Sequence, residues 1–117
     1  MNATTSNLES KIRSGRVIAG MSFQQKVWAV TAGIPRGRVM TYADVARRLK
    51  TAAYRAVGRA LHVNPYAPQV PCHRVVGSDG RLTGYAGGLP AKRRLLESEG
   101  IHFVGSRVDL RRCRVVG

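Results

Sequence analysis

The sequence predicts a single winged-helix-like domain that is mostly α-helical, has short strands and contains a helix-turn-helix. Three observations lead to this fold class. The chain has 117 residues, of which 44% are hydrophobic, and this suits one compact domain with a modest core. Several segments repeat apolar residues at the spacing of an amphipathic helix. The stretches between them are rich in proline and glycine, which favour loops and short strands.

The first helix of the domain is expected to begin at Ser22. Ser22 can cap it, and Gln25 three residues later completes a capping box. Gly33 can end the helix. Residues 1–21 are polar and lack the apolar centre of a secretory signal, so we expect a flexible N-terminal tail there and the domain at 22–117.

Two short helices are expected next, and together they suggest the helix-turn-helix. Thr41 is a plausible cap of the first, in which Tyr42, Val45 and Leu49 form an apolar stripe. The second is expected at about 52–62 and is rich in alanine and glycine, which would let it approach another surface closely. The pattern alone fits an ordinary helical hairpin equally well.

The remaining elements follow a loop that holds four prolines and many glycines. So much proline and glycine in a compact domain is typical of a shaped site. A helix is expected at 90–99, with Leu95 and Leu96 facing the core and Gly100 just past its end. Alternating apolar and polar residues around Gly105 and Ser106 predict a C-terminal β-hairpin.

Charge is the strongest global signal. The chain carries 20 Lys and Arg against 6 Asp and Glu, a net charge of +14, and arginine outnumbers lysine. Such an excess indicates nucleic acid as the partner, since arginine suits phosphate and stacks on bases. A merely basic, soluble surface is the alternative. No apolar run is long enough to span a membrane, and we expect a monomer.

The two cysteines, Cys72 and Cys113, are too few for a disulfide scaffold. No CxxC occurs and the three histidines are scattered, so we expect no metal site and no cofactor. Cys113 has no motif around it and is expected to be structural or incidental. A reducing compartment, either the cytoplasm of a prokaryote or a nucleus, fits this cysteine content best.

Cys72 stands in the run "VPCHRVV", beside His73 and Arg74. A thiol is mostly protonated at neutral pH, so a nucleophilic cysteine needs a base or positive surroundings. Neighbours in an extended segment point to opposite sides, so His73 could act through a water. A carboxylate that orients the imidazole would complete a triad, and Glu97 and Glu99 are the best candidates. A buried, inert cysteine is the alternative.

The chain resembles the DNA-binding, active-site domain of O6-alkylguanine-DNA alkyltransferases, from about Ser22 to Gly100. The resemblance is carried by "TYADVA", "RAVGRAL", "NP" eight residues before the cysteine, "PCHRVV", "GYAGGL" and "LLESEG". This combination is highly specific. It implies direct repair of DNA, in which the protein takes the alkyl group from O6 of guanine and reacts only once.

The resemblance also implies roles for individual residues. Cys72 looks like the acceptor thiolate, His73 like its general base acting through a water, and Glu99 like the carboxylate that orients His73. Asn64 looks like the residue that ties the turn between the second helix and the active-site strand. Tyr42 looks like the phenol beside the flipped base and its 3′ phosphate.

Substrate and DNA contacts are implied in the same way. Tyr85 looks like the ring lining the base pocket, the carbonyls of Cys72 and Val75 would accept from the guanine amino group, and the amide of Ala86 would reach O6. Arg55 looks like the finger that fills the gap left by the flipped base. The expected DNA-binding residues are therefore Arg55, Ala56, Gly58, Arg59 and Arg74, on a helix that enters the minor groove.

Two other functions stay open on the sequence. The length of the chain and its ending "FVGSRVDLRR" resemble alkyltransferase-like proteins, which bind alkylated DNA and flag it for nucleotide excision repair proteins. Those proteins have another residue in place of the cysteine, whereas this chain keeps Cys72, so transfer is favoured. A DNA-binding module with an idle cysteine would show no preference for alkylated DNA. The expected partner is double-stranded DNA that contains O6-alkylguanine.

Overall fold

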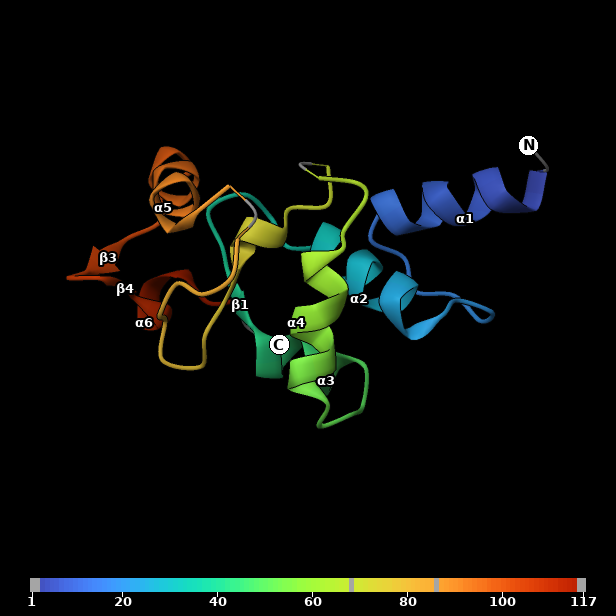
Figure 1. The fold of residues 1–117 in the computed structure, drawn as a ribbon, viewed down its shortest axis with the longest axis horizontal. Coiled ribbons are helices and arrows are strands. Elements are labelled where there is room, and N and C mark those ends of the chain that lie inside the picture. Colours follow the sequence, from blue (N-terminus) through green and yellow to red (C-terminus); the bar gives the residue numbers. More distant parts are fainter. Residues whose placement is uncertain (1–2, 68, 86, 116–117) are drawn as a thin grey trace.

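The computed structural model describes residues 3–67, 69–85 and 87–115, and within them the chain is mostly helical with short strands. The elements in chain order are α1 (Ala3–Arg13), α2 (Phe23–Ala32), β1 (Met40–Thr41), α3 (Tyr42–Arg48), α4 (Tyr54–His62), the single 3-10 turn η1 (Cys72–Arg74), β2 (Val75–Val76), α5 (Leu89–Ser98), β3 (Phe103–Val104), β4 (Arg107–Val108) and α6 (Leu110–Cys113). Figure 1 shows α1 at one end of the molecule and the β3–β4 hairpin at the other.

The expected capping residues begin α2 and α3. The Ser22 hydroxyl accepts from the amide of Gln25 and the Gln25 side chain accepts from the amide of Ser22, so the capping box is confirmed. Thr41 and Asp44 form a second capping box at α3. Because these reciprocal bonds satisfy amides at the helix starts, they fix where each helix begins.

Helices α3 and α4 form the predicted helix-turn-helix, and they lie against each other. Val57, Ala60 and Leu61 on α4 are buried, as expected. Burying a side chain such as Val57 stabilises the fold by about 1.5–3 kcal/mol. The helix begins at Tyr54, two residues later than expected, because Ala53 takes the cap position with a non-helical backbone.

Two buried clusters form the core. The larger lies among the first four helices and includes Ile12, Trp28 and Val45. Trp28 is held by a hydrogen bond of 2.8 Å from its Nε1 to the carbonyl of Ala60, and its ring meets Tyr66 edge-on. The smaller cluster gathers Val39, Val76, Leu96, Ile101, Val108 and Cys113.

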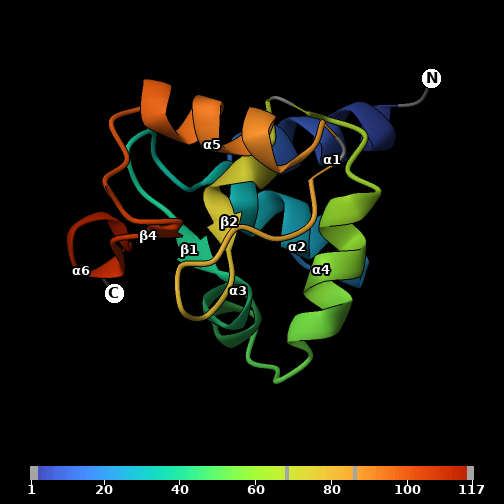
Figure 2. The same ribbon diagram turned by 60° about the vertical axis from the view of Figure 1, so that its left-hand side comes forward.

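The strands pair in two small sheets. Strands β1 and β2 are parallel, with Met40 opposite Val75, and they bring the turn before α3 beside the Cys72 segment. Figure 2 shows this pair between α5 on one side and α3 on the other. Strands β3 and β4 are antiparallel, so the predicted C-terminal hairpin is confirmed. The carboxyl-terminal end adds a parallel bridge between Val39 and Arg114.

Two sequence expectations differ from the structure. The segment before Ser22 is not a loose tail: α1 packs on α2, and Ile12 is completely buried. After α1 the chain turns back, and its backbone at Gly15 comes close to Gly33. An added Cβ at Gly15 would lie 3.0 Å from the Cα of Gly33, so this position suits glycine. Leu95 is 37% exposed and only Leu96 faces the core, because one helical step turns Leu95 outward.

No helix in the described parts of the chain has the length and apolar character needed to cross a membrane.

Candidate active site

A cavity of about 400 Å³ lies between α4, the Cys72 turn and the glycine-rich loop. Its walls are formed by the side chains and backbone of Tyr42, Tyr54, Arg55, Gly58, Leu61, His62, Asn64, Ala67, Cys72, Thr83, Gly84, Tyr85 and Gly87. Cys72 is half-buried there. The cavity therefore gathers residues from four distant parts of the sequence around one accessible thiol.

The Cys72 segment is a tight turn and not an extended strand. The amide of Arg74 donates to the carbonyl of Pro71 at 2.9 Å, and the amide of Cys72 donates to the carbonyl of Val70 at 2.9 Å. Pro71 restricts its own φ, and the result is the 3-10 turn η1, which continues directly into β2. The thiol is thus carried by backbone that is hydrogen-bonded on both sides.

Asn64 joins the end of α4 to this turn. Its Nδ2 donates to the carbonyl of Val70 at 2.9 Å, and its Oδ1 accepts from the amide of Tyr66 at 2.9 Å. An asparagine side chain can donate and accept at once, which suits it to bridging two backbone segments. These bonds lie where the resemblance places Asn64.

His73 is buried next to Cys72 and contacts Glu99. The distance from His73 Nε2 to Glu99 Oε2 is 3.1 Å. Glu99 also accepts a two-pronged ion pair from Arg74, with Nε to Oε1 at 2.9 Å and NH2 to Oε2 at 2.7 Å. Among the described residues, no hydrogen bond joins the Cys72 thiol to His73, so a proton passing between them would need a water.

The protonation states of this group follow from burial and charge. Burial opposes ionisation of Glu99, but hydrogen bonds from Arg74 and His73 outweigh it, so the pKa of Glu99 lies below its usual value. Burial lowers the pKa of His73, and the hydrogen bond with Glu99 only partly opposes this. An ionised carboxylate can only accept, so Nε2 carries the proton of the neutral imidazole and Nδ1 is left as the basic nitrogen.

Lys92 is completely buried, and its ammonium group lies between two segments of the site. Its Nζ donates to the carbonyls of Val75 and Thr83, both at 2.8 Å. Burial lowers the pKa of Lys92 to about 8, although attraction to Cys72 raises it. Tyr42 Oη meets the same Thr83, at 3.2 Å from its carbonyl, so one threonine joins the lysine to the phenol.

The other expected residues differ in where the structure places them. Tyr42, Tyr85 and Arg55 line the cavity with Cys72, and Arg55 is exposed. On α4, Ala56 and Gly58 are partly exposed, Gly58 also lines the cavity, and Arg59 is exposed. Ala86 lies outside the described residues. Val75 is completely buried, and its carbonyl already accepts from Lys92.

Arg74 requires a correction, because its guanidinium faces inward and not toward a DNA surface. Within the described residues, its guanidinium donates to Glu99 and to the carbonyl of Ile34, the latter at 2.8 Å, and 16% of its side chain is exposed. The sequence also gave no role to Lys92. It stands in a helix rich in basic residues, and its burial depends on contacts with the distant carbonyls of Val75 and Thr83. Among the described residues, no group of three or more potential metal ligands gathers.

Comparisons with known proteins identify the family of this chain. The sequence profile described as "6-O-methylguanine DNA methyltransferase, DNA binding domain" matches residues 22–101. A methylated-DNA–protein-cysteine methyltransferase from Methanosarcina mazei is 51% identical over 81 residues, which cover 68% of this chain and 51% of that protein. The inducible enzyme of the same name from Bacillus subtilis is 46% identical over 99 residues, covering 81% of this chain and 55% of the relative. The chain spans about half the length of these curated relatives.

Two solved structures are similar over 81% of this chain. The Mycobacterium tuberculosis OGT in complex with DNA has a TM-score of 0.65 at 39% identity, and 65% of its chain is covered. The S. pombe Atl1 in complex with damaged DNA containing O6-carboxymethylguanine has a TM-score of 0.73 at 27% identity, and 95% of its chain is covered. Since the profile spans most of the chain and the relatives agree over the same region, the chain belongs to the family defined by the DNA-binding domain of 6-O-methylguanine DNA methyltransferase.

Proposed function

We propose that this protein repairs DNA by taking the alkyl group from O6 of guanine onto Cys72, once per molecule. The observation that carries the proposal is a half-buried thiol lining a cavity of about 400 Å³, next to a buried histidine that contacts a mostly buried carboxylate. The names of the curated relatives support the same chemistry. The expected substrate is double-stranded DNA containing O6-alkylguanine, in a prokaryotic cytoplasm or a nucleus.

The reaction requires a nucleophilic sulfur and a place for its proton. His73 takes the thiol proton through a water at Nδ1, while Glu99 accepts at Nε2 and stabilises the imidazolium. The thiolate attacks the alkyl carbon attached to O6, a sulfur–carbon bond forms and the carbon–oxygen bond breaks. The electron pair goes to the guanine, which is then protonated. The thioether product has no easy leaving group, so Cys72 is consumed.

The guanine must leave the duplex to reach Cys72, at a cost of a few kcal/mol. The exposed side of α4 carries Ala56 and Gly58, whose small size lets the helix approach a minor groove. Arg55 lies on the same helix at the edge of the cavity, where it can fill the space left by the flipped base. Tyr42 and Tyr85 line the cavity and can contact the extruded base.

The test is mass spectrometry after incubation with an oligonucleotide containing O6-methylguanine. One methyl group should appear on Cys72 and the reaction should then stop. Cys72→Ala should still bind the DNA but lose transfer. Methyl on Cys113, or sustained turnover, would contradict the proposal, since Cys113 is buried outside the cavity.

A second candidate is a damage sensor that binds O6-alkylguanine and recruits nucleotide excision repair proteins. The match that covers 95% of the Atl1 chain favours it. The two functions separate in one experiment. A sensor would bind alkylated DNA more tightly than plain DNA and leave the adduct in place, whereas a transferase would remove the adduct.

A further inference from the structure

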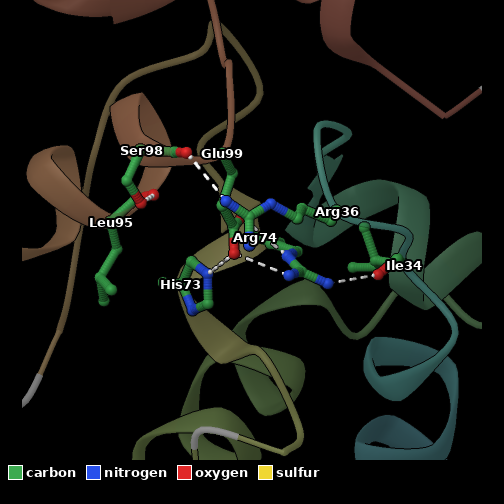
Figure 3. A network of polar contacts seen from close by, with 7 residues as sticks. All are labelled: Ile34, Arg36, His73, Arg74, Leu95, Ser98 and Glu99. Carbon is green, nitrogen blue, oxygen red and sulfur yellow. Dashed lines mark hydrogen bonds and ion pairs between the residues drawn. The ribbon is translucent and has the colours of Figure 1, made fainter.

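The side chain of Arg74 makes its hydrogen bonds to interior groups, although many other arginines of the chain are exposed. Its Nε and NH2 donate to the two oxygens of Glu99, and its NH1 donates to the carbonyl of Ile34 at 2.8 Å. Figure 3 shows the guanidinium between Glu99 and Ile34, with His73 on the other side of the carboxylate. The side chain thus joins the Cys72 turn to both the end of α5 and the turn after α2.

The two-pronged contact fixes the plane of the Glu99 carboxylate. A planar guanidinium matches a carboxylate with two parallel bonds, which a single ammonium group cannot reproduce. Oε2 is the shared atom, since it accepts from Arg74 at 2.7 Å and from His73 at 3.1 Å. The orientation of the imidazole therefore depends on where Arg74 holds this oxygen.

The backbone that carries Glu99 is held from the same side. Glu99 caps the carboxyl end of α5, where carbonyls lack helical partners. Arg36 donates to the carbonyl of Ser98 at 3.0 Å, from the turn that also contains Ile34. Arg36 is exposed, whereas Arg74 is mostly buried, so the rigid part of this connection is the Arg74 contact.

Burial is the main reason that the pKa of His73 is low, and three charged groups act on it as well. Glu99 raises the pKa, while Arg74 and Lys92 lower it by repulsion. Removing the charge of Arg74 would therefore raise the pKa of His73. A substitution that keeps the positive charge but removes the two-pronged contact with Glu99 would change the pKa of His73 little. It would leave the His73 imidazole less firmly oriented.

We propose that Arg74 is a positioning residue for alkyl transfer: it holds Glu99 in one orientation, and through Glu99 it keeps the His73 ring aligned as the base for Cys72. This inference rests on the proposed function. It goes further by assigning to the arginine of the "PCHR" run an interior role on the carboxylate.

The test compares Arg74→Met and Arg74→Lys with Arg94→Gln, which removes a positive charge from an exposed position of the same helix as Lys92. Single-turnover transfer is measured against pH, and ¹⁵N NMR of the His73 ring reports its tautomer and pKa. Arg74→Met should slow transfer at high pH by about 10²-fold, the usual scale for a misaligned group. The acidic limb of the pH–rate profile of Arg74→Met should also move to higher pH.

Arg74→Lys should keep the acidic limb of the wild-type pH–rate profile but lower the constant rate reached at high pH. The positive charge stays, whereas the two-pronged contact with Glu99 is lost. Arg94→Gln should leave the His73 ring unchanged in both NMR readouts. If Arg74→Met does not fold, Arg74→Lys decides the matter. A wild-type plateau in Arg74→Lys, together with an unchanged His73 tautomer and pKa in any folded Arg74 variant, would overturn the proposal.

The two proposals fail in different ways. If the wild-type protein transfers no alkyl group, the proposed function fails, while NMR still shows whether Arg74 controls His73. If the wild-type protein transfers and the folded Arg74 variants match it in rate and in the His73 spectrum, only the positioning role fails.

Discussion

Lys92 offers a sharp test of the electrostatics beneath the cavity. Its ammonium group is completely buried, and it makes hydrogen bonds of 2.8 Å to the carbonyls of Val75 and Thr83. Burial nevertheless lowers its pKa to about 8 from the ordinary 10.5. The two bonds therefore do not fully offset the loss of water around the charge.

The sign of the pH dependence follows from this difference. Between about pH 8 and 10.5 the unfolded chain keeps a proton on Lys92 that the folded chain has released, so the free energy of unfolding rises with pH. One pKa unit is worth about 1.4 kcal/mol, so we expect Lys92 to contribute a gain of about 2.5 kcal/mol between about pH 7 and about pH 10.

Lys92→Met removes this contribution while keeping a side chain of similar length. Urea unfolding of both proteins at the two pH values gives the change in each, and subtracting one from the other cancels the tyrosines and the other groups that they share. The wild-type protein should gain about 2.5 kcal/mol relative to the variant. Equal changes in the two proteins would refute the reasoning, because they would mean that Lys92 keeps an ordinary pKa in the folded state.

Three further predictions concern the site. Glu99→Gln should slow transfer by about 10²–10⁴-fold, whereas Glu97→Gln, which alters only an exposed pair, should have little effect in the same single-turnover assay; equal effects would mean the wrong carboxylate. Arg55→Ala should slow transfer from duplex DNA more than Arg47→Ala does, and the defect should shrink with free O6-benzylguanine, which needs no flipping; an equal defect on the free base would reduce Arg55 to a phosphate contact. Asn64→Ala should lower the free energy of unfolding in urea by about 1–3 kcal/mol, since it removes two hydrogen bonds, and no loss would show that the turn is held elsewhere.

The sequence predicted those parts of the fold whose signals are local. The capping box of Ser22 and Gln25, the cap at Thr41, the burial of one face of α4 and the C-terminal hairpin depend on residues within a few positions of each other. It missed α1 because "ATTSNLESKIR" is polar apart from a few residues. Ile12 is buried only because α2 supplies a surface to pack on, and this surface is distant in the sequence.

In the candidate site, too, the sequence did not predict contacts between residues that are distant in the chain. The resemblance named Cys72, His73 and Glu99, and the structure brings the last two together. Yet the sequence could not show that Arg74 turns inward, since an arginine beside a reactive cysteine in a chain of charge +14 also fits a DNA contact. Its direction depends on Glu99 and Ile34, which lie 25 and 40 positions away.

The two sides of the cavity are built differently. On one side, Cys72 lies on a tight turn. Hydrogen bonds from Asn64 and within the flanking backbone hold this turn in place. The facing loop has little packing at Gly84, where an added Cβ would meet no atom within 4 Å. Thr83, held by Tyr42 and Lys92, limits its movement at one end.

This difference suits a reaction in which the attacking atom stays in place and the alkyl group varies. In-line attack requires the sulfur to hold one direction, because a misplacement of about 1 Å can cost 10²-fold in rate. The wall facing it is open at Gly84 and closely packed at Gly87, where an added Cβ would lie 3.0 Å from the ring of Tyr85. A side chain at Gly87 would therefore displace the Tyr85 ring from the cavity wall, while one at Gly84 would have room outside it.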